Sequence, residues 1–566
     1  MNLVDTIKNL FKKDVPVIPV VEEKPKAIIS KYQQDFSVYD SFHEKHREHQ
    51  KKALKHLQVE SIGQISLPTG TGKTRVQVDI HIADMIDKTK KGESGVYVIG
   101  AHRLALCSQL LYDIVEVAMP CGINFDILYV GSERFNNDKI RTRMRSNGDI
   151  HDNLRAFDDK ISRGINTTRQ DEVVTFVNEA KANNRHVIAV ATYHSFHKLS
   201  LLPKIDICTY DEAHITVGDD FSGNIALVKP VIEKNFFFTA TRKVIGSHSG
   251  MNNTELYGDV LYSVAPRTMI EAGEIVAPLL HSIKISDDSE TGNFDNSKML
   301  FKTIKEGFTQ HRIKIKHHSA VPEKIGAKLL ISCSGSDELR EILASEELKQ
   351  WCNENSIKVL SFSSNPDVGY HFNFEKTTRS ELFDIMEDLK DEEDAILMHI
   401  DILTEGIDLP SITGVMPLRN LNQSKLIQTV GRATRLVRAD RTRLYSGALL
   451  PQQKTHFIKP YCWFLVPQLF SSLGDYNQML RLLREIMNTY QMKPEEFSSA
   501  DRFLAETDVV LPKVTEGDTV AKREKECNLK HVFEDIYLAE FQEEMGELSD
   551  EEKFSLIREE LLAYNA

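Results

Sequence analysis

The stretch ISLPTGTGKTR, residues 65–75, leads from an apolar run through a glycine-rich turn into residues 76–86, which have helical spacing. A glycine-rich turn between a strand and a helix directs backbone N–H groups and the helix N-terminus at one point, which forms an anion site. At the end of such a loop, Lys73 is placed to reach the β- and γ-phosphates, and the hydroxyl of Thr74 to hold Mg²⁺. The stretch therefore predicts a strand–loop–helix unit that binds ATP with Mg²⁺.

We call residues 67–74 the phosphate loop. It departs from the general pattern at one position, because Leu67 stands where that pattern has its first glycine, six residues before the lysine. The residues expected around the nucleotide phosphates are Thr69, Gly70, Thr71, Gly72, Lys73 and Thr74. Many unrelated proteins share such a loop, so it predicts nucleotide binding and leaves the use of the nucleotide open.

Outward from the phosphate loop, short apolar runs alternate with helical patterns twice along the chain, which predicts two α/β units with buried parallel sheets. The runs are SGVYVIGA, FDILYV, HVIAVAT, IDICTYDEAH and NFFFTATR in the first unit, and AKLLISCS, IKVLSFSS, AILMHID, GVMPL and YCWFLV in the second. The expected divisions are an N-terminal leader (1–40), a first unit (41–280) with an insertion at about 131–186, a second unit (281–467), and a helical, acidic C-terminal extension (468–566). Polar, acidic residues between 269 and 299 are expected to link the two units.

The composition is that of an ordinary globular protein, with 566 residues, 41% of them hydrophobic and 27% charged. No apolar run is long enough to predict a membrane span, and the N-terminus is too charged for a secretory signal. Seven cysteines without a C-x-x-C pair argue against a zinc ribbon or a disulfide framework, and we expect a cytoplasmic protein. With a net charge of −13, the chain would need a local basic surface to bind nucleic acid.

A pair of carboxylates follows the apolar run at residues 205–208, where the sequence continues TYDEAH. Asp211 and Glu212 therefore stand at the carboxyl end of a predicted strand. Adjacent carboxylates at this place suit two tasks in phosphoryl transfer: Asp211 can hold hydrated Mg²⁺ together with Thr74, and Glu212 can orient and deprotonate the attacking water.

LPTGTGKT and DEAH together resemble the first RecA-like domain of helicase superfamily two, in its DExH/DEAH-box group, and further segments resemble motifs of that family in the expected order. HREHQ resembles the adenine-recognising segment, GAHRLALCSQL and VATYHSF two nucleic-acid-contacting motifs, and FTATR the motif that couples the ATP state to strand contact. Arg242 replaces the proline that usually ends this last motif. The resemblance assigns adenine recognition to Arg47 and Gln50, and nucleic-acid contact or coupling to Arg103, Thr192, His214, Thr239 and Thr241.

The second unit continues the resemblance with LLISCSGSDELREI, DILTEGIDLPSIT and QTVGRATR, which are similar to motifs of the second RecA-like domain. These motifs place Gly406, Asp408 and Gln428 at the nucleotide. They also add Arg432 and Arg435 to the expected catalytic set of Lys73, Asp211 and Glu212. Because phosphoryl transfer spreads negative charge over the γ-phosphate, arginines of the second domain can stabilise it in trans. ATP would thus draw the two domains together.

The resemblance implies an ATP-dependent helicase or translocase, and its motif style is closest to restriction-type and repair-type enzymes, which favours DNA over RNA. Three alternatives stay open: an RNA helicase, a duplex translocase that does not unwind, and an ATP-gated regulatory subunit. No membrane partner is expected, and the C-terminal extension could bind a partner protein.

Two further features have no place in this set of motifs. The predicted insertion contains Arg141, Arg143 and Arg145, which either touch nucleic acid or belong to a solvated surface. Histidines recur every third residue at positions 43, 46 and 49. Because no cysteine or carboxylate accompanies them in a fixed pattern, we do not predict a metal site there.

Overall fold

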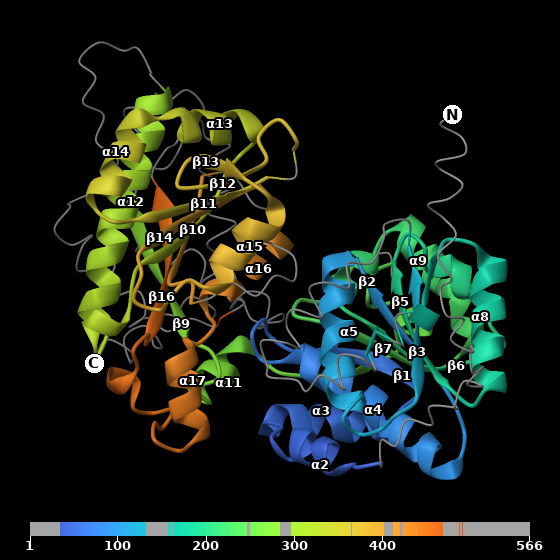
Figure 1. Cartoon of the computed structure of the whole chain (residues 1–566). Helices are drawn as coiled ribbons and strands as arrows, with labels where there is room; N and C mark the ends of the chain where they lie inside the picture. The colour runs from blue at the N-terminus through green and yellow to red at the C-terminus, as the bar shows by residue number, and fades with distance from the viewer. Residues whose placement is uncertain are drawn as a thin grey trace, which may run out of the picture.

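The computed structural model describes most of the chain between residues 34 and 467. The described ranges are 34–131 without 103, 157–283 without 159, 161 and 246–248, 296–400 without 364, and 411–467 without 419–422, together with residues 486 and 490. Within them the chain forms two α/β domains, each built on an eight-stranded sheet (Figure 1). The prediction of two tandem parallel-sheet domains is confirmed.

The first sheet is parallel throughout, in the order β4-β3-β5-β2-β6-β7-β1-β8. Its strands are β1 (Ile62–Ser66), β2 (Val96–Ala101), β3 (Phe125–Val130), β4 (Ile165–Thr167), β5 (His186–Thr192), β6 (Ile205–Tyr210), β7 (Ile232–Thr239) and β8 (Val260–Ser263). Strands β2, β3 and β6 are buried at every position, because helices cover both faces of the sheet.

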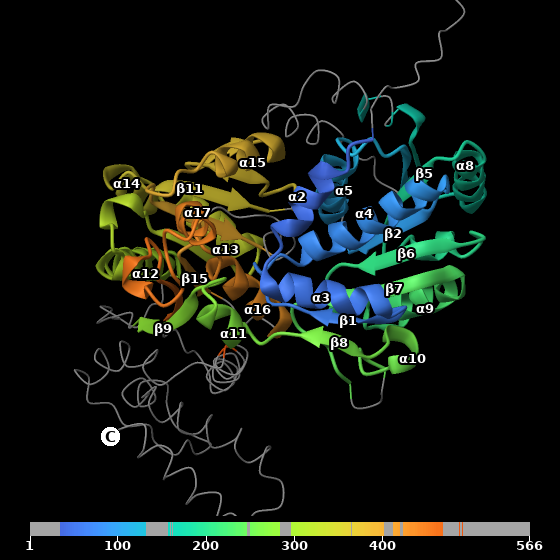
Figure 2. The same ribbon diagram turned by 90° about the horizontal axis from the view of Figure 1, so that it is seen from below.

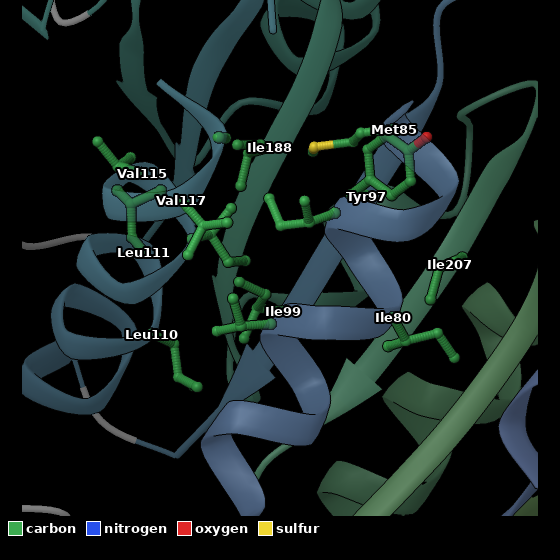
Figure 3. Packing of buried hydrophobic residues seen from close by; sticks show 14 of the residues in the cluster. Ile80, Met85, Tyr97, Ile99, Leu110, Leu111, Val115, Val117, Ile188 and Ile207 are labelled. Atoms are coloured by element: carbon green, nitrogen blue, oxygen red, sulfur yellow. The ribbon is translucent and has the colours of Figure 1, made fainter. Parts of the chain in front are cut away.

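The helices of the first domain are α2 (Ser37–Glu44), α3 (Glu48–Val59), α4 (Lys73–Lys91), α5 (Leu104–Ala118), α8 (Gln170–Ala182), α9 (Asp219–Val228), α10 (Thr254–Tyr257) and α11 (Pro266–Glu271). On one face, α3, α4 and α5 pack on the sheet; Figure 3 shows side chains of α4 and α5 meeting those of the central strands. On the other face, α8 and α9 cover a second apolar cluster.

The second sheet has the order β13-β12-β11-β14-β10-β15-β16-β9. Its strands are β9 (Ala277–Ile283), β10 (Lys328–Ser332), β11 (Lys358–Phe362), β12 (Tyr370–Phe372), β13 (Glu375–Thr377), β14 (Ala395–His399), β15 (Gly414–Pro417) and β16 (Tyr461–Pro467). Only β12 runs opposite to the other strands, because it pairs antiparallel with both β11 and β13 and forms a hairpin with β13 at one edge of the sheet. The helices are α12 (Asn296–His318), α13 (Ser336–Ala344), α14 (Glu346–Glu354), α15 (Arg379–Glu387), α16 (Gln423–Ala433) and α17 (Arg438–Tyr445).

Short 3₁₀ helices connect several of these elements. They are Phe196–Leu199, Ala213–Thr216, Lys229–Val231, Pro322–Lys324 and Lys454–His456. In the described part of the chain, none of the helices combines the length and the apolar character that a membrane-spanning helix needs.

The segment expected to link the domains contains β9. This strand pairs with β16 along its whole length and forms the edge of the second sheet, so the predicted boundary between residues 280 and 281 falls inside a strand. Its partner β16 stands 184 positions later in the chain, and polar, acidic residues follow it, which is why its apolar residues were not recognised as part of a sheet.

The predicted insertion at about 131–186 also contributes to the core. Its later part forms β4, which pairs with β3, and α8, whose Val173, Phe176 and Val177 are buried. The three arginines at positions 141, 143 and 145 lie outside the described residues. In the C-terminal extension, Ile486 and Tyr490 are described, and both are buried in the core of the second domain.

Candidate active site

The phosphate loop lies between β1 and α4, at the carboxyl end of β1. Gly70 and Gly72 both adopt φ = 84°, in the left-handed region that favours glycine. Thr71 braces the loop from inside, because its buried hydroxyl donates to the carbonyl of Pro68 at 2.7 Å. Helix α4 begins immediately afterwards, so the N–H groups of its first turn open toward the loop, as in an anion site.

The N-terminal end of α3 is attached to this loop by side-chain hydrogen bonds. Gln50 Nε2 donates to the carbonyls of Thr71 at 3.1 Å and Gly72 at 3.3 Å, and His49 Nε2 lies 2.8 Å from the carbonyl oxygen of Thr71. A side chain at residue 72 would collide with this amide, because a Cβ there would lie 2.3 Å from Gln50 Nε2. The Arg47–Gln50 segment therefore adjoins the phosphate loop.

Arg47 connects this segment to two residues that the sequence did not indicate. Its Nη1 donates to Glu274 Oε2 at 2.6 Å, and its guanidinium lies 5.5 Å from the centre of the Tyr445 ring. Tyr445 ends α17 of the second domain, so Arg47 contacts both domains.

Two carboxylates follow β6. Asp211 Oδ1 accepts a hydrogen bond from Gln77 Nε2 at 2.9 Å, and its backbone carbonyl accepts one from the Tyr193 hydroxyl at 2.5 Å. Lys73 Nζ donates to Glu212 Oε1 at 3.3 Å. The lysine of the phosphate loop and the glutamate of DEAH, 139 positions apart, are therefore in direct contact.

The two carboxyl groups have pKa values shifted in opposite directions. Burial and the neighbouring Glu212 carboxylate raise the pKa of Asp211 to about 6. Burial also opposes ionisation of Glu212, but the charge and the hydrogen bond of Lys73 outweigh it, and the pKa of Glu212 lies below its usual range. At neutral pH both carboxyl groups are ionised, which suits a site that receives a cation.

A chain of hydrogen bonds runs from the second domain into the first. Gln428 Nε2 lies 3.2 Å from His214 Nε2, and His214 Nδ1 lies 2.9 Å from Thr239 Oγ1. Because an amide nitrogen can only donate, His214 Nε2 accepts and its Nδ1 donates. The Thr239 hydroxyl donates in turn to the carbonyl of Thr241 at 2.7 Å. The histidine of DEAH thus joins α16 to the FTATR segment after β7.

Helix α16 of the second domain packs directly against the phosphate loop, where the two domains meet (Figure 2). A Cβ added at Gly431 would lie 2.7 Å from Thr69 Cβ, so only glycine permits this approach. A Cβ added at Gly70 would lie 3.0 Å from Arg435 Cγ, so the Arg435 side chain lies over the loop. Arg432 is 4% exposed, and its charge contributes to the lowered pKa of Glu212.

A buried lysine, which the sequence did not indicate, supports these arginines. Lys459 Nζ donates to the carbonyls of Ile412 at 2.8 Å and Ala433 at 2.7 Å, and also to the carbonyl of Arg435. The backbone N–H of Lys459 is held by Asp440 Oδ2 at 2.9 Å. This ammonium therefore fixes the C-terminal end of α16, although nothing in the sequence marks the residue except its place before β16.

The geometry fits a nucleotide with Mg²⁺. Gly70 and Gly72 adopt the left-handed conformation that lets the phosphate loop turn sharply into α4, and Thr69 Oγ1 is buried without a hydrogen-bond partner among the described residues. Thr74, half-buried in the first turn of α4, and Asp211 supply the hydroxyl and carboxylate oxygens that Mg²⁺ prefers.

The remaining predicted residues are placed only in part. Thr192 ends β5, two strands from β6 in the sheet. Arg103, Gly406 and Asp408 lie outside the described residues. Arg242 stands where the corresponding family motif usually has a proline. Its side chain has a structural role here, because its Nε donates to the buried Gln64 Oε1 of β1 at 2.8 Å.

Two family models match the chain in separate regions. One, described as the res subunit of Type III restriction enzymes, covers residues 43–244, and one, described as the helicase conserved C-terminal domain, covers residues 314–437. A comparison with curated protein sequences gave no match.

Two solved structures are similar in fold. The ATP-dependent Type ISP restriction-modification enzyme LlaBIII bound to DNA is 14% identical, with a TM-score of 0.53 over 89% of this chain and 35% of that one. A nuclease-deletion mutant of the Type ISP enzyme LlaGI, in complex with a DNA substrate mimic, is 16% identical, with a TM-score of 0.50 over 78% of this chain and 28% of that one. The chain thus spans about a third of the length of these enzymes. With both family models matched in order on two parallel-sheet domains, the chain belongs to helicase superfamily two.

Proposed function

We propose that the protein is an ATP-dependent motor that hydrolyses ATP with Mg²⁺ and moves along DNA. One observation carries this proposal most strongly: Lys73 and Glu212 of the first domain lie beside Arg432 and Arg435 of the second. Anion-binding groups and a candidate base from the first domain therefore converge with two arginines from the second domain on the same loop, as phosphoryl transfer requires.

In the proposed reaction, the N–H groups of the phosphate loop and the Lys73 ammonium hold the phosphates. Thr74 and Asp211 would hold Mg²⁺, which supplies positive charge to the β- and γ-phosphates. Lys73 moves from its contact with Glu212 toward the phosphates, which frees the Glu212 carboxylate to orient water and accept its proton. Arg432 and Arg435 balance the charge that develops on the transferring group.

The hydrogen-bond chain through His214 supports coupling of this reaction to movement. It joins Gln428 in the second domain to Thr239 and Thr241, which the family resemblance places at the link to the nucleic-acid strand. A change in the distance between the domains would therefore alter the contacts both at the nucleotide and at the nucleic-acid strand. DNA is the preferred substrate because the Type ISP enzymes of similar fold were solved with DNA or a DNA mimic.

The test measures steady-state ATP turnover with single-stranded DNA, duplex DNA, forked DNA and RNA side by side. We expect stimulation by DNA that exceeds stimulation by RNA, and no stimulated turnover in Glu212→Gln, which should still bind ATP. Greater stimulation by RNA would make the protein an RNA helicase. Turnover that no nucleic acid stimulates would favour a regulatory subunit instead.

Strand displacement then separates unwinding from movement alone. A fluorescently labelled forked duplex reports unwinding, and displacement of a triplex strand from duplex DNA reports translocation. Turnover with triplex displacement and without duplex separation would identify a duplex translocase.

A further inference from the structure

Three side chains that are able to bind a metal meet beside the phosphate loop, away from the proposed reaction. His43 lies in the last turn of α2, His46 lies in the short connection between α2 and α3, and Asp79 lies on α4. Asp79 Oδ2 is 2.8 Å from His43 Nδ1 and 3.3 Å from His46 Nε2. The candidate ligand atoms of all three residues lie within 4.8 Å of one another. The carboxylate that the sequence pattern lacked thus comes from a helix more than thirty positions away.

The hydrogen bonds of His46 leave its second nitrogen without a partner. Its Nδ1 lies 2.9 Å from the carbonyl oxygen of Phe42, and because a carbonyl only accepts, Nδ1 carries the proton. In the neutral ring, Nε2 then presents a lone pair toward Asp79. Nε2 makes no hydrogen bond among the described residues, and His46 is only 5% exposed. Burial lowers the pKa of His46, so the neutral ring prevails at neutral pH.

Asp79 is a buried carboxylate whose hydrogen-bond partners among the described residues are His43 at Oδ2 and Tyr39 at Oδ1. It is 1% exposed, and Oδ1 accepts a hydrogen bond from the Tyr39 hydroxyl at 3.2 Å. In the described part of the chain, no lysine or arginine forms an ion pair with it. The nearby Arg75 is directed elsewhere, since its Nη2 donates to the Phe42 carbonyl at 2.6 Å and its guanidinium lies over the Phe42 ring. A cation between a buried carboxylate and an imidazole lone pair would offset the cost of burying the negative charge.

We propose that His43, His46 and Asp79 form a binding site for a divalent transition metal of the Zn²⁺ type. Two imidazole nitrogens and one carboxylate oxygen suit Zn²⁺, and hard cations such as Mg²⁺ prefer all-oxygen sets. The Phe42 carbonyl and the Tyr39 hydroxyl already orient two of the ligands in the manner of outer-shell partners.

Two of the three distances between the ligand atoms are close to those that a bound metal needs. Ligand atoms about 2.0–2.1 Å from a tetrahedral Zn²⁺ lie roughly 3.3 Å apart. His46 Nε2 and Asp79 Oδ2 have this separation, and His43 Nδ1 would move outward by about half an ångström, in line with the same geometry. The His43 side chain is 39% exposed, so water can reach the fourth position and the metal can enter.

A metal at this place would hold the adjoining segment on α4. Asp79 stands six positions after Lys73 on the helix that starts at the phosphate loop, and Arg47 directly follows His46. The metal would therefore fasten the Arg47–Gln50 segment to that helix. This role is structural and does not depend on ATP hydrolysis.

The test uses the full-length chain, freed of metal with EDTA and titrated with Zn²⁺ in competition with a chromophoric chelator. We expect the wild type to bind one equivalent more than His46→Gln and Asp79→Asn, and Zn²⁺ to raise the melting temperature of the wild type alone. Co²⁺ in place of Zn²⁺ should give the visible absorption of a tetrahedral ion. His317→Gln, which removes an exposed histidine on α12, is the matched control and should bind like the wild type.

His43→Gln keeps the buried His46–Asp79 pair, so it should fold normally and bind Zn²⁺ at least about tenfold more weakly. Equal Zn²⁺ binding by the wild type and the folded His46→Gln and His43→Gln variants would overturn the proposal, and the cluster would then be a proton-sharing contact only.

Discussion

The two domains have the same architecture, but they supply side chains to the candidate active site between them in different ways. In the first, the functional side chains come from the first turns of α4 and from the end of β6 and hold one another, as in the Lys73–Glu212 and Gln77–Asp211 contacts. In the second, they lie on α16 or directly after it, as Gln428 and Arg432 do on the helix and Arg435 does two residues beyond its end, and Arg435 lies over the phosphate loop of the other domain. In the proposed reaction the phosphate loop of the first domain would hold the phosphates, whereas the charge-balancing arginines belong to the second domain. Turnover should therefore depend on how closely the domains approach.

The largest expected effect comes from removing one reactive group from each domain. Glu212→Gln removes the candidate base, and Arg435→Ala removes a guanidinium that lies over the phosphate loop. Each should lower kcat by about 10³-fold with nucleotide binding retained, because both act on the transition state. ATPase assays and equilibrium binding of a fluorescent ATP analogue measure the two quantities.

Arg438→Ala is the matched control, because this arginine is exposed at the start of α17. If Arg435→Ala turns over ATP at the parental rate while Glu212→Gln does not, Arg435 does not stabilise the transition state.

A smaller effect is expected from Gly431→Ala. The added methyl group would lie 2.7 Å from Thr69 Cβ, so α16 has to withdraw from the phosphate loop. Overpacking of this kind costs about 1–3 kcal/mol, which corresponds to roughly a tenfold to hundredfold loss of kcat. ADP binding should stay unchanged, since the first domain holds the nucleotide.

Gly335→Ala provides the control for that change, because a Cβ at residue 335 meets no atom within 4 Å and its backbone is extended. Wild-type turnover by Gly431→Ala would show that the contact seen between α16 and the loop plays no part in catalysis.

Lys459→Met tests the support of the arginines within the second domain. Burial lowers the pKa of Lys459 to about 8, and its ammonium bonds three backbone carbonyls. Leaving buried carbonyls unpaired costs about 1–3 kcal/mol each, so we expect the free energy of unfolding to fall by about 3 kcal/mol. Turnover should fall by about tenfold because the end of α16 loosens.

Urea unfolding and ATPase assays check the result, with Lys324→Met as the control at an exposed lysine. A loss of stability with full turnover would make Lys459 a purely structural residue.

The smallest effect should be the same in both domains and concerns acid stability. His81 bonds Thr209 in the first domain and His311 bonds Thr413 in the second, and burial lowers the pKa of each histidine to about 3. Each is neutral when folded but protonates near pH 6.5 when unfolded, so stability is lost as the pH falls from 6.5 toward 3. The loss is about 1.4 kcal/mol per pH unit, or about 2 kcal/mol for each histidine at pH 5.

His81→Gln and His311→Gln should each flatten this dependence, measured as the urea midpoint at pH 6.5 and pH 5. An unchanged slope in one variant would indicate that its histidine is already protonated in the folded domain.

Much of the fold was predictable because the central strands are continuous apolar runs. FDILYV and HVIAVAT coincide with β3 and β5, residue for residue. The strands that were missed, such as β4, β12 and β13, are three residues long and lie at or next to sheet edges, where three residues with little burial are too few to show a period. β9 was hidden in an expected linker because its partner, β16, stands almost two hundred positions later.

By itself, the sequence determined the strand–loop–helix unit at residues 65–75, the carboxylates after β6 and the order of the motifs. These depend on the local backbone: glycines that permit a turn and side chains that follow a strand. Only the tertiary structure decided that Arg435 lies over Gly70, that Lys459 holds the end of α16, and that Asp79 completes a cluster with His43 and His46. These contacts join distant positions, and the packing of helices on the two sheets, which no local pattern encodes, brings them together.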